Sequence, residues 1–198
     1  MALTKKQKVI LQPVPVLFAG LLNANGQLGP AEIPNKRQWL IKDVMRRANS
    51  QGMKVLAPPT HPFNPLLALR VASIETDMNV KHDLVWKLLD AAWQNGRDIS
   101  NADVVSEIAS SVGLNGKDCV NAAMNDQVLK DRLRIQTEEA IATGVFGVPT
   151  TTVDGEHFWG SESDTMSHIE AKILGKDPID SAVFARWSTI SASAGRKR

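Results

Sequence analysis

The sequence contains a single cysteine, Cys119, and no tyrosine. One cysteine excludes an intramolecular disulfide, a Cys-x-x-Cys redox pair and a cysteine-based zinc site. The stretch GLNGKDCVNAAM around Cys119 has a helical pattern, so we expect a buried structural thiol. Without tyrosine, no phenol group can activate a thiol in this protein.

Long apolar runs and an excess of one charge are also missing. Gln12, Pro13 and Pro15 interrupt the apolar stretch that a signal peptide would need, and no run predicts a membrane span. The net charge is only +2, and no aromatic residue interleaves with the basic GRKR end. We therefore expect a solvated end, a protein of the reducing cytoplasm, and neither a nucleic-acid nor a membrane partner.

The histidines form no recognisable metal site. They stand at positions 61, 82, 157 and 168, without the spacing of metal ligands, and the sequence lacks HExxH, GxSxG, phosphate-loop and dinucleotide motifs. We expect no metal. The apolar fraction of 43% and charged fraction of 22% are those of a soluble globular protein.

The order of patterns predicts an α/β fold with a helical insertion. Large apolar residues predict a strand over 8–18, and Gly, Pro and Asn predict a long loop over 19–36. Helical patterns cover 36–52, 66–79, 81–96, 101–113, 116–144 and 161–175, with Asn101 or Ser100 and then Ser161 as N-caps. Two short strands flank an Asp154-Gly155 turn. We expect the core anchors to include Trp39, Trp86, Trp93 and Trp187.

Pro149, in the stretch GVFGVPTTTVDGEHFWGS, admits two interpretations. A trans proline would mark the start of an edge strand, whereas a cis proline would leave the N–H and C=O of Val148 free to pair with an extended peptide. The following GSES would begin a helix whose free N–H groups suit a carboxylate. These two features together describe a site for a small acidic peptide such as glutathione; the alternative is only a helix cap and an edge proline.

This stretch, with PVLFAGLLNANGQLGPAEIPNKRQWL and APPTHPFNPLLALR, resembles the DsbA-like 2-hydroxychromene-2-carboxylate isomerases and kappa-class glutathione transferases. The three motifs agree in order over residues 8–175. The resemblance implies a thioredoxin-like domain over 1–30 and 126–198 with an inserted helical domain over 31–125. It also implies a homodimer, glutathione as cofactor, and cis–trans isomerisation of an aromatic acid by reversible thiol addition, with glutathione transferase activity as a possible addition.

The resemblance also implies roles for particular residues. Val148, before cis-Pro149, would bind the cysteinyl backbone of glutathione, and Ser161 with Glu162 would hold the γ-glutamyl end. Lys36 would contact the other charged end of the peptide, with assistance from Gln27.

A second set of residues would face the aromatic substrate. The Pro-rich loop PPTHPFNP would wall the pocket through His61, Phe63 and Asn64, although a rigid turn is the other interpretation of His61.

The sequence departs from the family pattern in two places. GSES replaces GSDR, so that Glu162 stands for an aspartate and Ser163 for an arginine. Nothing matches the family's first strand and its SPYSY-like turn, whose serine stabilises the glutathione thiolate, so the catalytic residue is unknown. A late start site, a re-paired sheet or a partner-donated strand would account for the missing strand, and we favour the first.

Two other functions compete with this prediction. One is a catalytically impaired family member that acts as a glutathione-binding or scaffold protein. The other is a dithiol oxidoreductase, against which the single cysteine argues strongly.

Overall fold

The computed structural model describes Gln7 and residues 9–195. The described residues do not include Lys8, where the expected strand begins, or 196–198, which belong to the expected solvated end. The chain divides into two compact units, one made of Met1–Val9 with Val148–Arg198 and the other of Ile10–Gly147. The finer division into a thioredoxin-like domain and an insertion over 31–125 stays a prediction.

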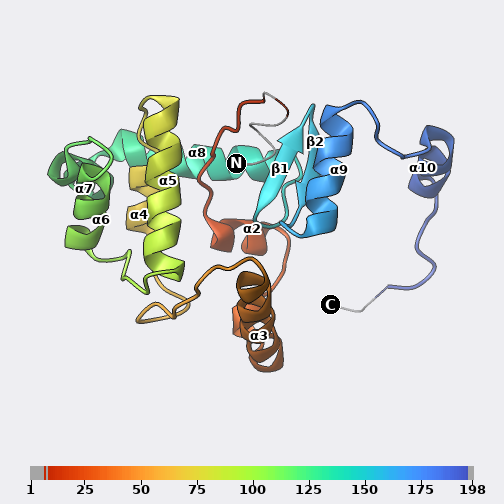
Figure 1. The fold of residues 1–198 in the computed structure, drawn as a ribbon. Coiled ribbons are helices and arrows are strands. Elements are labelled where there is room, and N and C mark those ends of the chain that lie inside the picture. The colour runs from red at the N-terminus through yellow and green to blue at the C-terminus, as the bar shows by residue number, and fades with distance from the viewer. Residues whose placement is uncertain (1–6, 8, 196–198) are drawn as a thin grey trace. The chain divides into compact units, whose positions relative to one another are not determined.

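The larger unit is built from helices in the part that the structure describes (Figure 1). They are α2 (Phe18–Ala24), the 3-10 helix η1 (Pro30–Glu32), α3 (Pro34–Ser50), α4 (Leu66–Ala72), α5 (Met78–Trp93), α6 (Ala102–Ser110), α7 (Gly116–Asn125) and α8 (Gln127–Ala142). The expected helices in this region are confirmed except for 66–79, which ends at Ala72, and Met78 already begins α5. The Asn101 cap is also confirmed, because its side-chain oxygen accepts hydrogen bonds from the backbone N–H groups of Asp103 and Val104.

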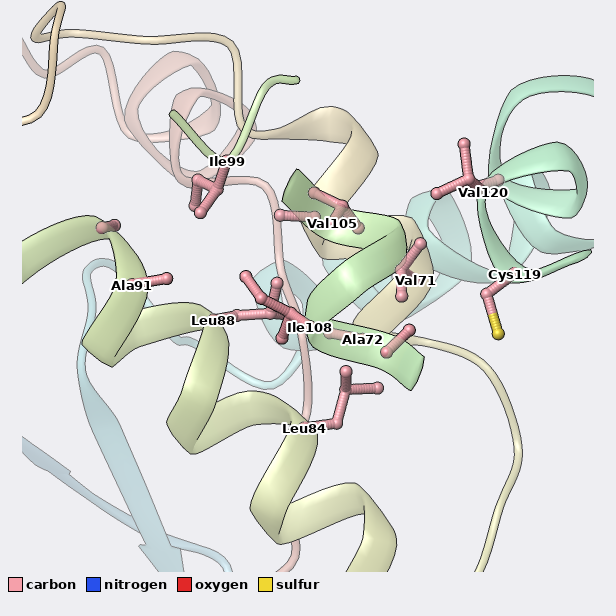
Figure 2. Close-up of a cluster of buried hydrophobic side chains, with 14 of the residues drawn as sticks. Val71, Ala72, Leu84, Leu88, Ala91, Ile99, Val105, Ile108, Cys119 and Val120 are labelled. Atoms are coloured by element: carbon pink, nitrogen blue, oxygen red, sulfur yellow. The ribbon is translucent and has the colours of Figure 1, made fainter. Parts of the chain in front are cut away.

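The core of this unit consists of aliphatic side chains from α4 to α8. Leu84 and Leu88 of α5 and Ile108 of α6 point into the same cluster, and Cys119 of α7 lies at its edge (Figure 2). Cys119 is 8% exposed, which confirms the predicted buried thiol. Alanines at 68, 72, 91, 92, 109 and 123 complete the cluster, so the helices approach one another closely.

The prediction that tryptophans anchor the core is wrong. Trp39, Trp86 and Trp187 are each more than half exposed, and Trp93 is 36% exposed. An indole ring is too large for an interface lined with alanine, and aliphatic side chains fill the space between the helices instead.

The prediction for residues 8–36 is also wrong. Residues 9–17 have no regular secondary structure, and Phe18 begins α2. Pro13 and Pro15 are alternate residues, so they remove two ladder donors from the same edge of an extended segment. In the expected loop, Pro30 and Pro34 stand in the first turns of η1 and α3, where a missing N–H breaks no helical hydrogen bond.

The smaller unit contains a β-hairpin and two helices among its described residues. Strand β1 (Thr150–Val153) pairs antiparallel with β2 (Glu156–Trp159), with Thr150 opposite Trp159. The predicted two-residue turn is confirmed, since Asp154 and Gly155 both have positive φ, 50° and 80°. Helix α9 (Ser163–Ile173) packs on both strands and buries Ile169.

Three features of this unit differ from the sequence prediction. The N-cap of α9 is Glu162, one residue after the expected Ser161. A further helix, α10 (Ser181–Ser188), was not predicted; Asp180 caps it by accepting from the N–H groups of Ala182 and Val183. The sheet has two strands in the described residues, so the chain is mostly helical there. None of the described helices combines the length and the apolar character that crossing a membrane would require.

Candidate functional site

An aromatic cluster forms where the Pro-rich loop meets the end of α5. The ring centroids of His61 and Trp93 are 5.5 Å apart, those of Phe63 and Trp93 are 5.9 Å apart, and His61 meets Phe63 at 6.5 Å. The Leu56 N–H donates to the Trp93 carbonyl oxygen at 2.8 Å and holds the preceding segment against α5. The cluster offers a partly exposed aromatic surface to a planar ligand.

Helix α3 brings one cation into contact with this cluster. Arg37, in the first turn of α3, donates through Nη2 to the His61 carbonyl oxygen at 3.1 Å. Burial, and then the positive charge of Arg37, lower the pKa of His61 below its ordinary value, which favours a neutral imidazole at neutral pH. Lys36, predicted to bind glutathione, is exposed and precedes Arg37 in the same helical turn.

The other predicted residues of the larger unit have local structural contacts. The Gln27 N–H donates to the Leu22 carbonyl oxygen at 2.9 Å in the turn after α2, and the residue is exposed. Asn64 accepts a hydrogen bond at its side-chain oxygen from the Leu66 N–H, 3.0 Å away, and thereby opens α4. This bond forms a local turn at the end of the loop that carries His61 and Phe63.

In the smaller unit, the peptide bond between Val148 and Pro149 is cis. Val148 is 41% exposed. The Gly160 N–H donates to the Pro149 carbonyl oxygen at 2.9 Å, which continues the register of the hairpin by one pair. The hairpin thus places Val148 close to the residues that begin α9.

The start of α9 carries a carboxylate of its own. Glu162 accepts a hydrogen bond at Oε2 from the Ser161 backbone N–H, at 3.0 Å. Gly160 has φ +101°, and the carboxylate lies where a Cβ at Gly160 would be. An acid near a helix N-terminus is favourable, so a ligand carboxylate would compete with Glu162, whereas a ligand ammonium would be attracted to it.

The nine predicted residues therefore fall into two sets. The larger unit holds Gln27, Lys36, His61, Phe63 and Asn64, and the smaller unit holds Val148, Pro149, Ser161 and Glu162. Contacts link His61 with Phe63 in one set and Ser161 with Glu162 in the other.

Sequence reasoning missed two residues of the aromatic region, Arg37 and Trp93. Arg37 directly follows Lys36, a predicted glutathione-binding residue, and this position in the sequence was the signal that could have identified it. Trp93 lies on one face of α5 with Trp86 and Leu89, a spacing that is equally typical of a core helix. Only the exposed fraction of these side chains separates the two interpretations.

Cys119 is unsuited to act as a nucleophile. Burial, and then the nearby charge of Asp118, raise the pKa of its thiol above the ordinary value. The thiolate form, which carries cysteine reactivity, is therefore disfavoured.

Comparison with known proteins relates the chain to one family. The family model of the DSBA-like thioredoxin domain matches residues 2–170. The chain is 24% identical to glutathione S-transferase kappa 1 of Rattus norvegicus over 191 residues, covering 87% of this chain and 82% of that protein. It is 26% identical to glutathione S-transferase kappa 2 of Caenorhabditis elegans over 181 residues, covering 87% and 76%. A solved structure of 2-hydroxychromene-2-carboxylate isomerase matches with a TM-score of 0.77 at 19% identity, covering 96% of this chain and 89% of that one.

Proposed function

Because the chain belongs to the DSBA-like thioredoxin domain family, we propose that it binds glutathione and uses it to isomerise an aromatic acid. The substrate class would be that of 2-hydroxychromene-2-carboxylate, with glutathione transferase activity as an addition. The similarity to two kappa-class transferases supports the cofactor. The observation that carries the proposal is the aromatic cluster beside the cationic first turn of α3.

The larger unit would supply the substrate pocket. Phe63 and Trp93 would pack against the aromatic ring of the substrate, because their rings form one cluster. Lys36 would attract a carboxylate of glutathione. The Arg37 side chain already donates to the His61 carbonyl oxygen in the Pro-rich loop. His61, with its lowered pKa, would contribute a neutral hydrogen-bonding ring rather than a second cation.

The smaller unit would hold the peptide part of glutathione. Val148, which is 41% exposed, would pair through its backbone with the cysteinyl residue, as an added strand pairs with a sheet edge. Glu162 would accept from the γ-glutamyl ammonium group, and the Ser161 hydroxyl is exposed beside it. The donors and acceptors present thus fit glutathione.

Bound glutathione would supply a thiol that adds reversibly to a conjugated double bond. The contribution of the protein would be to orient the two reactants and to exclude water from them. Cys119 is not a candidate for the reacting thiol, since its own pKa is raised by burial.

Calorimetric titration of reduced glutathione into the full chain tests the proposal. Saturable binding should weaken at least tenfold in Lys36→Ala and in Ser161→Ala. The matched controls are Lys42→Ala, an exposed lysine of the same helix, and Ser167→Ala, whose hydroxyl bonds within α9 to the Ser163 carbonyl oxygen. Absence of binding by the folded protein would overturn the proposal.

An isomerase assay separates the proposed function from its alternative. Turnover that requires glutathione supports the enzyme, whereas binding without turnover supports a glutathione-binding or scaffold protein. The homodimer is also a proposal, and sedimentation equilibrium at several concentrations checks it.

A further inference from the structure

A cavity of about 300 Å³ lies between the turn after α4 and helices α7 and α8. It belongs wholly to the larger unit and uses none of the residues proposed for glutathione. Its apolar lining includes Cys119, Ala122 and Leu129. Cys119 is the lining residue that Figure 2 labels, at the edge of the core. The volume is at the lower end of the range for small-molecule sites.

The charged residues around the cavity are mostly acidic. Glu75, Asp118 and Asp126 supply three carboxylates, and the cations are the guanidinium of Arg132 and the ammonium of Lys81, which donates to the carbonyl oxygen of the lining residue Ile74 at 3.0 Å. The formal balance is therefore −1. Arg132 is already engaged, since its Nη2 lies 3.0 Å from Glu75 Oε1 and its Nη1 donates to the Ser73 carbonyl oxygen at 3.1 Å. The guanidinium is therefore poorly placed to bind an anionic ligand.

The carboxylates differ in what they already do. Asp126 caps α8 by accepting from the Val128 N–H at 2.8 Å, and Glu75 pairs with Arg132. Within the described residues, the Asp118 carboxylate has neither a hydrogen bond nor an ion pair, although it lies close enough to Cys119 to influence the thiol. Asp118 thus presents, in the first turn of α7, a carboxylate without a side-chain partner beside an apolar surface.

We propose that this cavity binds a small organic cation, with its apolar body against Cys119, Ala122 and Leu129 and its ammonium group beside Asp118. Contact with the apolar lining removes hydrocarbon from water, and the acidic rim selects the charge of the ligand. Glutathione, a net anion at neutral pH, does not match this rim. The Cys119 thiol takes part as an uncharged contact surface.

Three ligands of one shape and different charge test the proposal. The probes are 2-phenylethylamine, a cation at pH 7, the neutral 2-phenylethanol and the anionic 3-phenylpropionate. Each is titrated into the ¹⁵N-labelled full chain up to ~10 mM, a concentration that reveals millimolar affinity. We expect saturable amide shifts confined to residues 74–75 and to α7 and α8, for the ammonium compound alone.

A matched pair of variants isolates the role of Asp118. Asp118 and Asp103 are each an exposed acid in the first turn of a helix, but only Asp118 lines the cavity. Asp118→Asn should weaken 2-phenylethylamine about tenfold, and Asp103→Asn should leave it unchanged. Equal weakening in both variants would overturn the proposal, because it would mean unspecific attraction to an acidic surface.

Two further measurements keep the proposal falsifiable. Ala122→Leu should fill the cavity and abolish the shifts, and its folding is checked by unchanged amide signals of α5 and α6, which belong to the same unit but do not line the cavity. Cys119 is the single cysteine, and bound 2-phenylethylamine should slow its alkylation by N-ethylmaleimide. The rate is measured over hours in mildly alkaline solution, because the raised pKa of the thiol makes the reaction slow at pH 7. Binding of the alcohol as tightly as the amine, or of none of the three, would refute the proposed ligand class.

Discussion

Gly116→Ala is expected to destabilise the protein, although helix propensity alone predicts the opposite. A Cβ at Gly116 would overlap the Ser106 carbonyl oxygen, and would lie 2.7 Å from its carbonyl carbon and 2.5 Å from Ser110 Oγ. The oxygen and carbon belong to the backbone of α6, so they cannot rotate away. Ordinary van der Waals contact begins at 3.4 Å, so the carbon alone requires α7 to move by 0.7 Å.

The size of the effect follows from the packing of α6 against α7. A gap of 0.5–1 Å removes roughly a quarter to a half of the dispersion energy of each contact across it. Overpacking of this kind costs about 1–3 kcal/mol, and alanine in place of glycine returns at most about 1 kcal/mol. Because three atoms are overlapped and two of them belong to the backbone, we place the cost at the upper end of this range, about 3 kcal/mol. We therefore expect a net loss of about 2 kcal/mol.

Urea denaturation and a thermal scan measure this loss. For a chain of this length, the expected decrease in Tm is about 4–8 °C. Lys117→Ala, an exposed neighbour on α7, is the control and should change the free energy of unfolding by less than ~0.5 kcal/mol. A Gly116→Ala protein as stable as the parent would refute the close approach of α7 to α6.

Three further predictions concern titration and exposure. His61 should titrate below its ordinary pKa in NMR, and Arg37→Ala should raise that pKa, because the charge of Arg37 is one of the two causes that lower it. An unchanged pKa would contradict the contact between Arg37 and His61. The hydrogen bond from Lys172 to Glu156 is 2.6 Å long and raises the pKa of Lys172. Its contribution to the free energy of unfolding is complete below the ordinary lysine pKa and is lost as the pH rises through the raised pKa. Stability should thus fall in strongly alkaline solution, and Glu156→Gln should remove that part of the fall. Trp187→Ala should alter the free energy of unfolding by less than ~0.5 kcal/mol, since Trp187 is 68% exposed; a larger loss would show that another surface covers it.

The features that the sequence predicted well depend on neighbouring residues. The Asp154-Gly155 turn needs two residues that tolerate positive φ, and both occur together. Asn101 caps α6 through residues two and three positions away. The residues that form these features lie within a few positions of one another, so a short stretch of sequence is enough to predict them.

The candidate site was predicted in part for the same reason. The cis bond before Pro149 was one of two interpretations of a local pattern, and the predicted N-cap of α9 lies within one residue of the observed one. The presence of Lys36 in a helix was likewise a local prediction. Arg37 was missed because its contact with the His61 carbonyl oxygen joins residues 24 positions apart. Trp93 was misassigned to the core because the spacing of large residues on α5 does not indicate which face of the helix packs against other helices.

The sequence by itself determined where α6 begins, where the hairpin turns, and that one cysteine cannot form a disulfide within the chain. Only the tertiary structure decided which helix faces are buried, because burial depends on which distant segments come together. It assigned alanines and leucines to the core of the larger unit and left the indole rings outside it. It also left a cavity beside Asp118 and Cys119, since the space between α7 and α8 is set by the packing of both helices and not by either one alone.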